Sequence, residues 1–288
     1  MIKRVIFLLV VLFGTTAVPV HAELPAAIAV IDTGTNTELF KNNIVAEYCV
    51  LEFTNCPNGK PTMEDAGAAN VPPTTYTQFD HGSQMISIML KVNPNAKIIP
   101  IRIMGSNKNG SPTIYTNNAV KMALDWVVLN AAKYNIKIVN VSQGAIFANC
   151  KVPAGTAEDV AQLKALGVAV VAASGNGSNR TAMDSIACLP DVISVGATDN
   201  PDPGVKGIAW DPKAKPYIAR YSNGNAQTSY YTNGRWYVTN NNGTTKFMVG
   251  TSNASAALAA FLLTNPTPVT TTASNEWLTG KYVFIPLP

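Results

Sequence analysis

Short apolar runs alternate with segments of helical periodicity from residue 26 to residue 198, and this alternation constrains the fold more than any other feature of the sequence. The runs are rich in β-branched residues and have no polar face, which is typical of strands buried on both sides. We therefore predict an α/β fold with a doubly wound, mostly parallel central sheet flanked by helices. The predicted strands are 26–31, 97–103, 136–142, 168–173 and 192–198, and the predicted helices start at His81 and cover 114–134, 157–166 and 254–263.

Two regions depart from this pattern. Residues 36–80 show no clear period and include a stretch rich in Pro, Thr and Ala, so we predict a surface excursion there. From residue 201 to residue 243, aromatic residues alternate with turn signals such as Asn223-Gly224 and Asn233-Gly234. This pattern favours antiparallel hairpins that lie over the sheet late in the chain. Neither region requires a second domain.

The first residues have the pattern of a secretory signal peptide. Lys3 and Arg4 precede an unbroken apolar run, 5–13, that is too short to cross a bilayer comfortably. Ala22 supplies a small residue at the expected cleavage point. We therefore predict a signal peptide over residues 1–22 and export to a periplasm or to the cell exterior, between which the sequence does not decide.

The remaining residues, 23–288, are predicted to form a single catalytic domain. No later apolar run is long enough to cross a membrane, so we do not expect an integral membrane protein after signal cleavage. Only residues 23–25 separate the predicted signal from the first predicted strand, so no propeptide is evident. The oligomeric state is left open.

The charge balance gives no support for a nucleic-acid partner. The full chain has 21 Lys and Arg against 17 Asp and Glu, a net charge of +4. Without Lys3 and Arg4 the basic residues number 19 (21 − 2), and the net charge is +2 (19 − 17). Because the basic residues also form no run, a nucleic-acid-binding surface is not expected.

The cysteines of the chain, Cys49, Cys56, Cys150 and Cys188, all follow the predicted signal. An even number in an exported protein predicts two disulfides. Local spacing favours a bond from Cys49 to Cys56, which leaves Cys150 for Cys188, although the two other connectivities stay open. A zinc site is the rival interpretation, and it is poorly supported because no C-x-x-C pair is present and His81 is the only histidine after the signal.

Four polar residues stand at predicted strand ends or helix starts: Asp32, His81, Asn176 and Ser252. Singly, Asp32 is typical of a turn, Ser252 of a helix cap, and His81 of a structural or surface histidine. Together they form the set that attack of a hydroxyl on an acyl carbon requires. Ser252 would lose a proton to His81, Asp32 would orient and stabilise the imidazolium, and the Asn176 amide with the Ser252 backbone N–H would hold the oxyanion.

The order Asp, His, Ser and the local sequences resemble the subtilisin-like serine proteases, the subtilases. The motifs are Val30-Ile-Asp-Thr-Gly34, His81-Gly-Ser83, Asn140-Val-Ser-Gln-Gly144, Ala172-Ala-Ser-Gly-Asn176 and Gly250-Thr-Ser-Asn-Ala254. The resemblance extends from about residue 26 to residue 265. It implies a subtilisin-like fold and an exported serine endopeptidase that cleaves protein or peptide substrates through an acyl-enzyme.

The resemblance also implies where substrate binds. An extended peptide would add as a strand between Ser142-Gln143-Gly144 and the loop at Gly110 and Ser111. The side chain before the cut bond would enter a pocket walled by Ala172, Ala173, Ser174 and Gly175. Asp184 would lie near the floor of that pocket and favour Lys or Arg there.

The chain also departs from the family's pattern. Ile86 and Ser87 replace the small residues that usually follow the His motif, and Ala256 stands where proline is usual. The loop that often carries calcium looks absent, so calcium is not predicted there. No cofactor is expected, and a structural calcium ion stays an open but unsupported alternative. These departures keep a second hypothesis open: a catalytically weak or inactive subtilase-like module that binds peptide or a protein partner. Acyl chemistry on an ester or a transferred peptide is a third.

Overall fold

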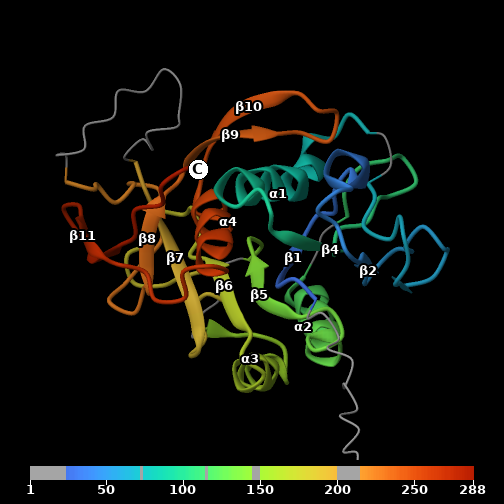
Figure 1. The fold of residues 1–288 in the computed structure, drawn as a ribbon, viewed down its shortest axis with the longest axis horizontal. Helices are drawn as coiled ribbons and strands as arrows, with labels where there is room; N and C mark the ends of the chain where they lie inside the picture. The colour runs from blue at the N-terminus through green and yellow to red at the C-terminus, as the bar shows by residue number, and fades with distance from the viewer. Residues whose placement is uncertain (1–23, 72–73, 114–115, 145–149, 200–214) are drawn as a thin grey trace, which may run out of the picture.

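The computed structural model of the chain is built on one large, mostly parallel sheet with helices on both faces (Figure 1). The structure describes residues 24–71, 74–113, 116–144, 150–199 and 215–288. The predicted signal peptide therefore lies outside the described residues. The α/β prediction with a doubly wound parallel sheet is confirmed.

The sheet has ten strands in the order β11-β12-β8-β7-β6-β5-β1-β4-β2-β3. The predicted strands correspond to the five at its centre, with ends that differ by a residue or two. The strands are β1 (Ala27–Asp32), β2 (Tyr48–Val50), β3 (Thr62–Met63), β4 (Lys97–Arg102), β5 (Ile136–Val141), β6 (Ala169–Ala173), β7 (Val192–Thr198), β8 (Tyr230–Asn233), β11 (Thr271–Ser274) and β12 (Thr279–Tyr282).

The helices divide between the two faces of the sheet, as Figure 1 shows. On one face lie α1 (His81–Val92) and α4 (Thr251–Leu262), and on the other lie α2 (Asn117–Asn130) and α3 (Thr156–Ala165). Short 3-10 turns, η1 (Thr37–Phe40) and η2 (Thr77–Asp80), precede them. The hairpin of β9 (Arg235–Thr239) and β10 (Thr245–Val249) covers α1.

Strand β1 shows why the chain folds in this way. Its side chains alternate between two hydrophobic clusters: Ala29 and Ile31 pack with α2 and α3, whereas Ile28 and Val30 pack with α1 and α4. All four are at most 1% exposed. A strand with no polar face can be buried only between two layers, so the apolar run dictates the doubly covered sheet.

Three parts of the sheet were not predicted. Strands β2 and β3 lie inside the region expected to be an irregular surface excursion, and β11 and β12 extend the opposite edge. β8, which falls in the region predicted to form hairpins, instead pairs in parallel with β7. The antiparallel pairing expected late in the chain is found in β9–β10, which packs on α1 rather than over the sheet, and in β11–β12.

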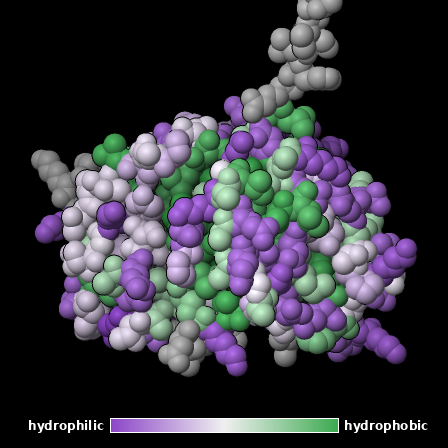
Figure 2. All heavy atoms as spheres, turned by 90° about the horizontal axis from the view of Figure 1, so that it is seen from below, coloured by the Kyte–Doolittle hydropathy of each residue, from purple (hydrophilic) through white to green (hydrophobic). Residues whose placement is uncertain are grey.

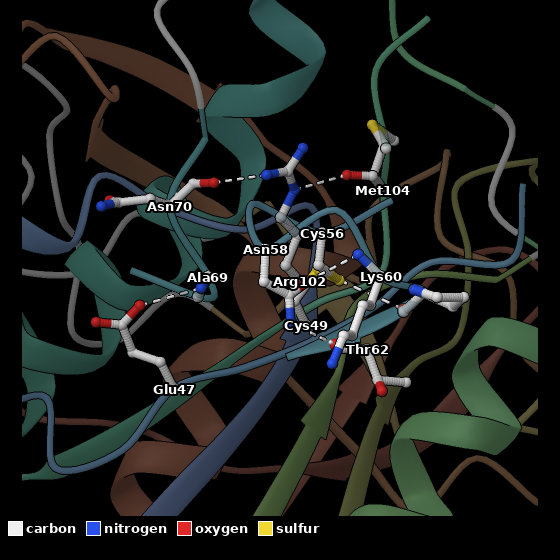
Figure 3. Close-up of a disulfide and its surroundings, with 12 residues drawn as sticks. Glu47, Cys49, Cys56, Asn58, Lys60, Thr62, Ala69, Asn70, Arg102 and Met104 are labelled. Atoms are coloured by element: carbon white, nitrogen blue, oxygen red, sulfur yellow. Dashed lines mark hydrogen bonds between the residues drawn. A yellow bond between two sulfur atoms is a disulfide. The ribbon is translucent and has the colours of Figure 1, made fainter. Parts of the chain in front are cut away.

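Two disulfides join the cysteines as the local spacing favoured. Cys49 is bonded to Cys56, and Cys150 is bonded to Cys188. The first closes a loop at the end of β2, next to the buried side chain of Arg102 (Figure 3). Arg102 donates to the carbonyl oxygens of Asn70 and Met104, at 2.6 and 2.9 Å. Burial lowers the pKa of this guanidinium to about 10, and the two carbonyls tie the loop before α1 to the end of β4.

The face of the molecule drawn in Figure 2 is mixed in hydropathy. Seen from below, hydrophilic and hydrophobic residues are intermixed over the face of the molecule (Figure 2). Among the described residues, no helix combines the length and the apolar character that a membrane crossing requires.

The two disulfides are expected to contribute unequally to stability. They close loops with sequence separations of 7 and 38 residues. Chain entropy in the unfolded state then predicts roughly 2 kcal/mol for Cys49–Cys56 and roughly 4 kcal/mol for Cys150–Cys188. Thermal unfolding of the Cys49→Ser/Cys56→Ser and Cys150→Ser/Cys188→Ser variants measures both. Equal losses, or a larger loss for the first pair, would contradict the loop-length explanation.

Candidate active site

The carboxyl ends of three neighbouring strands, β1, β5 and β6, meet at one rim of the sheet. Because the strands are parallel and adjacent, the segments that follow them lie side by side. Asp32 ends β1, Ser142 follows β5, and Ser174 follows β6. The starts of α1 and α4 reach the same rim and bring His81 and Ser252. Open α/β sheets commonly place their ligand sites at such a rim.

Asp32 and His81 are in direct contact. His81 Nδ1 lies 2.8 Å from Asp32 Oδ1 and 3.0 Å from Oδ2. An ionised carboxylate only accepts hydrogen bonds, so Nδ1 carries the proton and Nε2 is left as the acceptor. The Asp32 side chain is 2% exposed and that of His81 22%. Burial opposes the imidazolium, but the charge and hydrogen bond of Asp32 outweigh it and raise the pKa of His81.

The start of α1 is locked onto the turn that follows β1. The Gly82 N–H donates to Thr33 Oγ1 at 3.0 Å, and Thr33 Oγ1 donates to Phe79 O at 3.3 Å. A Cβ atom on Gly82 would lie 2.0 Å from the carbonyl oxygen of Gly34. Only glycine permits this approach, so the glycine after His81 sets the distance between the imidazole and Asp32.

Ser252 is the second residue of α4, and it is partly exposed at the rim. Its backbone N–H belongs to the first turn of the helix, where amides have no partner within the helix. In the described part of the chain the Ser252 hydroxyl donates to the Ser142 carbonyl at 3.2 Å rather than to the His81 ring. His81 and Ser252 nevertheless line the same pocket.

The orientation of the Asn176 side chain is fixed by Thr251. The Thr251 N–H and its hydroxyl both donate to Asn176 Oδ1, at 2.9 and 3.1 Å. The Thr251 hydroxyl in turn accepts from the Gly175 N–H at 3.1 Å. With Oδ1 held in this way, the Nδ2 group of Asn176 is the part left to donate to a ligand in the pocket that it lines.

Asp184 is held behind Gly175. Asn223 Nδ2 donates to Asp184 Oδ1 at 3.1 Å. Gly175 has a φ of +102°, and a Cβ atom there would meet both Asn223 and Asp184 at less than 2.5 Å, so the position requires glycine. Burial raises the pKa of Asp184 to about 6, against the opposing effect of the Asn223 hydrogen bond.

These groups surround a small, polar pocket of about 230 Å³. Its lining comprises His81, Ser142, Gln143, Gly144, Ala173, Gly175, Asn176, Asp184, Thr251 and Ser252. Asp32 stands behind His81 and is buried. The structure therefore gathers most of the predicted site residues around one cavity.

Four predicted substrate-binding residues do not line this pocket. Ala172 and Ser174 are buried in the sheet at the end of β6. Gly110 and Ser111 form a tight turn in which the Asn107 N–H donates to Ser111 O at 2.8 Å. Two residues that were not among the predicted site residues hold groups of the site. Thr251 donates to Asn176, and Asn223 donates to Asp184. Thr251 stood next to the predicted nucleophile in the sequence, whereas nothing in the sequence pointed to Asn223.

No group of three or more His, Cys, Asp or Glu side chains in the described residues is placed to hold a metal ion. Among these residues the anionic side chains of the rim, Asp32 and Asp184, are engaged by His81 and Asn223 respectively.

The sequence is similar to a known protein family and to named proteases. A model of the subtilase family matches residues 26–265. "Subtilisin-like protease 3" of Pseudogymnoascus destructans is 31% identical over 185 residues, which are 62% of this chain and 41% of that protein. An "extracellular serine proteinase" of a Thermus species is 35% identical over 105 residues, which are 36% of this chain and 22% of that protein. The chain thus spans less than half the length of both relatives.

Solved structures share the fold. One described as "Sphericase" has a TM-score of 0.63 at 20% identity and covers 88% of this chain and 82% of its own. A "cold adapted subtilisin-like serine proteinase" has a TM-score of 0.59 at 21% identity, covering 83% of this chain and 74% of its own. At these identities the similarity shows a shared fold alone.

The close approach of Gly82 to Gly34 can be tested by replacing Gly82 with alanine. The added methyl group must push α1 away from β1, so we expect a loss of about 2 kcal/mol in unfolding free energy together with a lower His81 pKa. Gly59→Ala is the matched control, because a Cβ atom at position 59 meets nothing within 4 Å. The positive φ of Gly59 alone should lower the unfolding free energy of that variant by about 1 kcal/mol. Denaturant unfolding of both variants decides. A Gly82→Ala loss no larger than that of Gly59→Ala would refute the steric argument.

Proposed function

The chain belongs to the subtilase family, and from this premise we propose that it is a serine endopeptidase that hydrolyses peptide bonds through an acyl-enzyme. The observation that supports the proposal most strongly is the 2.8 Å contact of His81 Nδ1 with the buried Asp32 carboxylate, beside a pocket that Ser252 also lines. The remaining requirements of the reaction are a mobile proton, donors for the oxyanion and a surface for the peptide.

In the proposed mechanism Ser252 is the nucleophile and His81 the general base. The His81 tautomer that donates from Nδ1 to Asp32 leaves Nε2 free to accept the hydroxyl proton of Ser252. The hydroxyl would exchange its bond to Ser142 O for one to His81 Nε2 as it attacks the substrate carbonyl. Asp32 stabilises the imidazolium that results, and the same proton then passes to the leaving amine.

The negative charge on the tetrahedral intermediate needs donors that are in place beforehand. We assign this role to Asn176 Nδ2 and to the Ser252 N–H at the start of α4, where the helix dipole also favours negative charge. Thr251 supports the assignment because it engages Asn176 Oδ1 and so turns the donor end of the amide to the pocket. The chemistry requires neither a metal nor a cofactor.

The proposed substrate is an extended protein or peptide segment that binds along Ser142-Gln143-Gly144. These residues follow β5 and line the pocket. The proposal that the loop at Gly110 and Ser111 binds the other side of the peptide rests on family resemblance. We also propose that the protein is exported, to a periplasm or to the cell exterior. The two disulfides and the name of the Thermus relative support this location.

A weak or inactive module that binds peptide is the second candidate. One observation favours it: the Ser252 hydroxyl donates to Ser142 O, so it is not poised on the imidazole in this arrangement. A binding module, however, has no use for the buried Asp32–His81 pair. Measurement of peptide hydrolysis distinguishes the two candidates.

Replacement of Ser252 with alanine is expected to abolish peptide hydrolysis, with a loss of roughly 10³-fold or more in kcat, and to leave the unfolding temperature unchanged. Ser229 at the edge of β7 and β8 supplies a matched control, since its hydroxyl bonds only Ser194 among the described residues. Ser229→Ala should retain full activity. A Ser252→Ala protein that cleaves as fast as the parent would remove Ser252 from the mechanism.

Asp184 is expected to select Lys or Arg before the cut bond, and to do so in a pH-dependent way. Its pKa of about 6 means that the carboxyl is neutral below this pH and anionic above it. Selectivity for Arg over Leu should therefore rise by about 10- to 100-fold as the pH increases through 6.

A panel of peptides varied at that position, assayed from pH 5 to pH 8, measures the effect. Asp184→Asn is the control, because it keeps the shape and removes the charge. A preference for Phe or Leu over Arg at pH 8 in the parent protein would end the assignment.

A further inference from the structure

The side chain of Gln143 lies against the Asp32–His81 pair. Its Nε2 atom is 3.0 Å from Asp32 Oδ1 and also 3.0 Å from His81 Nδ1. The family resemblance assigned Gln143 only a main-chain role in binding peptide. The structure instead places its amide group at the third corner of a triangle whose other corners are the carboxylate and the imidazole.

Donor and acceptor chemistry determines which way this amide points. An oxygen in place of Nε2 would face the Asp32 carboxylate oxygen at 3.0 Å with no hydrogen between them. The nitrogen is therefore the atom that faces Asp32, and it donates to Oδ1. Since His81 Nδ1 also carries a proton directed at Asp32, the contact between Gln143 Nε2 and His81 Nδ1 brings two donors together and stabilises neither.

Asp32 Oδ1 consequently accepts from three groups. They are the Thr33 N–H at 2.7 Å, His81 Nδ1 at 2.8 Å and Gln143 Nε2 at 3.0 Å. Oδ2 lies 3.0 Å from His81 Nδ1, so it can accept the imidazole hydrogen bond while Oδ1 accepts from Gln143 and Thr33. The carboxylate is thus held from the end of β5 as well as from β1.

We infer that Gln143 is a positioning residue, whose side-chain amide fixes the Asp32 carboxylate and limits how strongly that carboxylate stabilises the protonated His81. The inference rests on the proposed function for its consequence in catalysis. For its physical effect it rests only on the two 3.0 Å distances.

The effect on His81 has a definite sign. The positive end of the amide dipole lies beside Nδ1 and repels a positive charge on the imidazole. The amide also donates a hydrogen bond to Asp32, which weakens the attraction of that carboxylate for the imidazolium. Both contributions disfavour the imidazolium. Within the described ranges, the charged groups around the imidazole are Asp32 from β1, Lys246 from β10, the neighbouring Asp80, and Asp184 across the pocket. Helix α4 brings none, since Thr251–Leu262 contains no ionisable side chain. Removing the Gln143 amide should therefore raise the pKa of His81.

The pKa of His81 can be measured by NMR from the imidazole Cε1–H signal of the full chain. The chain has two histidines, His21 and His81, and the His81→Ala variant assigns the signal. All samples carry Ser252→Ala, so that digestion of the protein by itself cannot interfere. Gln143→Leu removes the donor at similar size, Gln143→Glu replaces it with a carboxyl group, and Gln227→Leu, at an exposed position, is the matched control.

We expect the His81 pKa to rise by about 0.5 to 1 unit in Gln143→Leu, to rise further in Gln143→Glu, and to stay within about 0.2 unit in Gln227→Leu. In proteins with Ser252 intact, the acid limb of kcat/KM should move in the same direction and order. An unchanged or lowered His81 pKa in both Gln143 variants would overturn the inference.

The two proposals can fail separately. If the NMR titrations shift as expected while the Ser252-intact protein hydrolyses no peptide, the role of Gln143 at Asp32 and His81 stands and the proposed protease activity fails. If peptide is hydrolysed but neither pKa nor acid limb responds to Gln143, the activity stands and the positioning role fails.

Discussion

The hydrogen bond from His81 Nδ1 to the Asp32 carboxylate is the interaction on which the rest of the site depends. It joins the end of β1 to the start of α1, and it gives a hydrogen-bond partner to a carboxylate whose side chain is 2% exposed. A buried charge without such a partner would be strongly destabilising. The glycine contact between α1 and the turn after β1 makes the distance achievable, and the covered sheet beneath provides a rigid base for both groups.

The strand ends and helix starts around this pair each bring residues to the same pocket. Helix α4 brings Ser252 and its backbone N–H in the first turn, the segment after β6 brings Asn176, and the segment after β5 brings the edge proposed to bind peptide. Hydrogen bonds hold three of the side chains at this rim: Thr251 donates to Asn176, Asn223 donates to Asp184, and Gln143 and the Thr33 N–H donate to Asp32. The rim is therefore built on a network of side-chain hydrogen bonds.

The sequence predicted the centre of the fold because its strands are buried on both faces and leave continuous apolar runs. It did not predict the edges of the sheet. Strands β2 and β3 are very short and β11 is largely exposed, so their residues show no hydrophobic alternation that would identify a strand. It proposed Asp32, His81, Asn176 and Ser252 from their places at strand ends and helix starts, and the structure brings these four residues to one rim. It did not locate Asn223, which comes from a distant loop, nor the position of the Gln143 amide, because both depend on tertiary packing. The Ser142 carbonyl as partner of the Ser252 hydroxyl was also unforeseen.

His81 is proposed to activate Ser252 by accepting its hydroxyl proton. Fluorophosphonates react only with an activated serine, so the rate at which such a reagent labels the protein measures this activation directly. We expect stoichiometric labelling at Ser252 in the parent protein, and a labelling rate at least about 10³-fold lower in His81→Ala. Labelling of the parent at another residue, or an unchanged rate in His81→Ala, would contradict it.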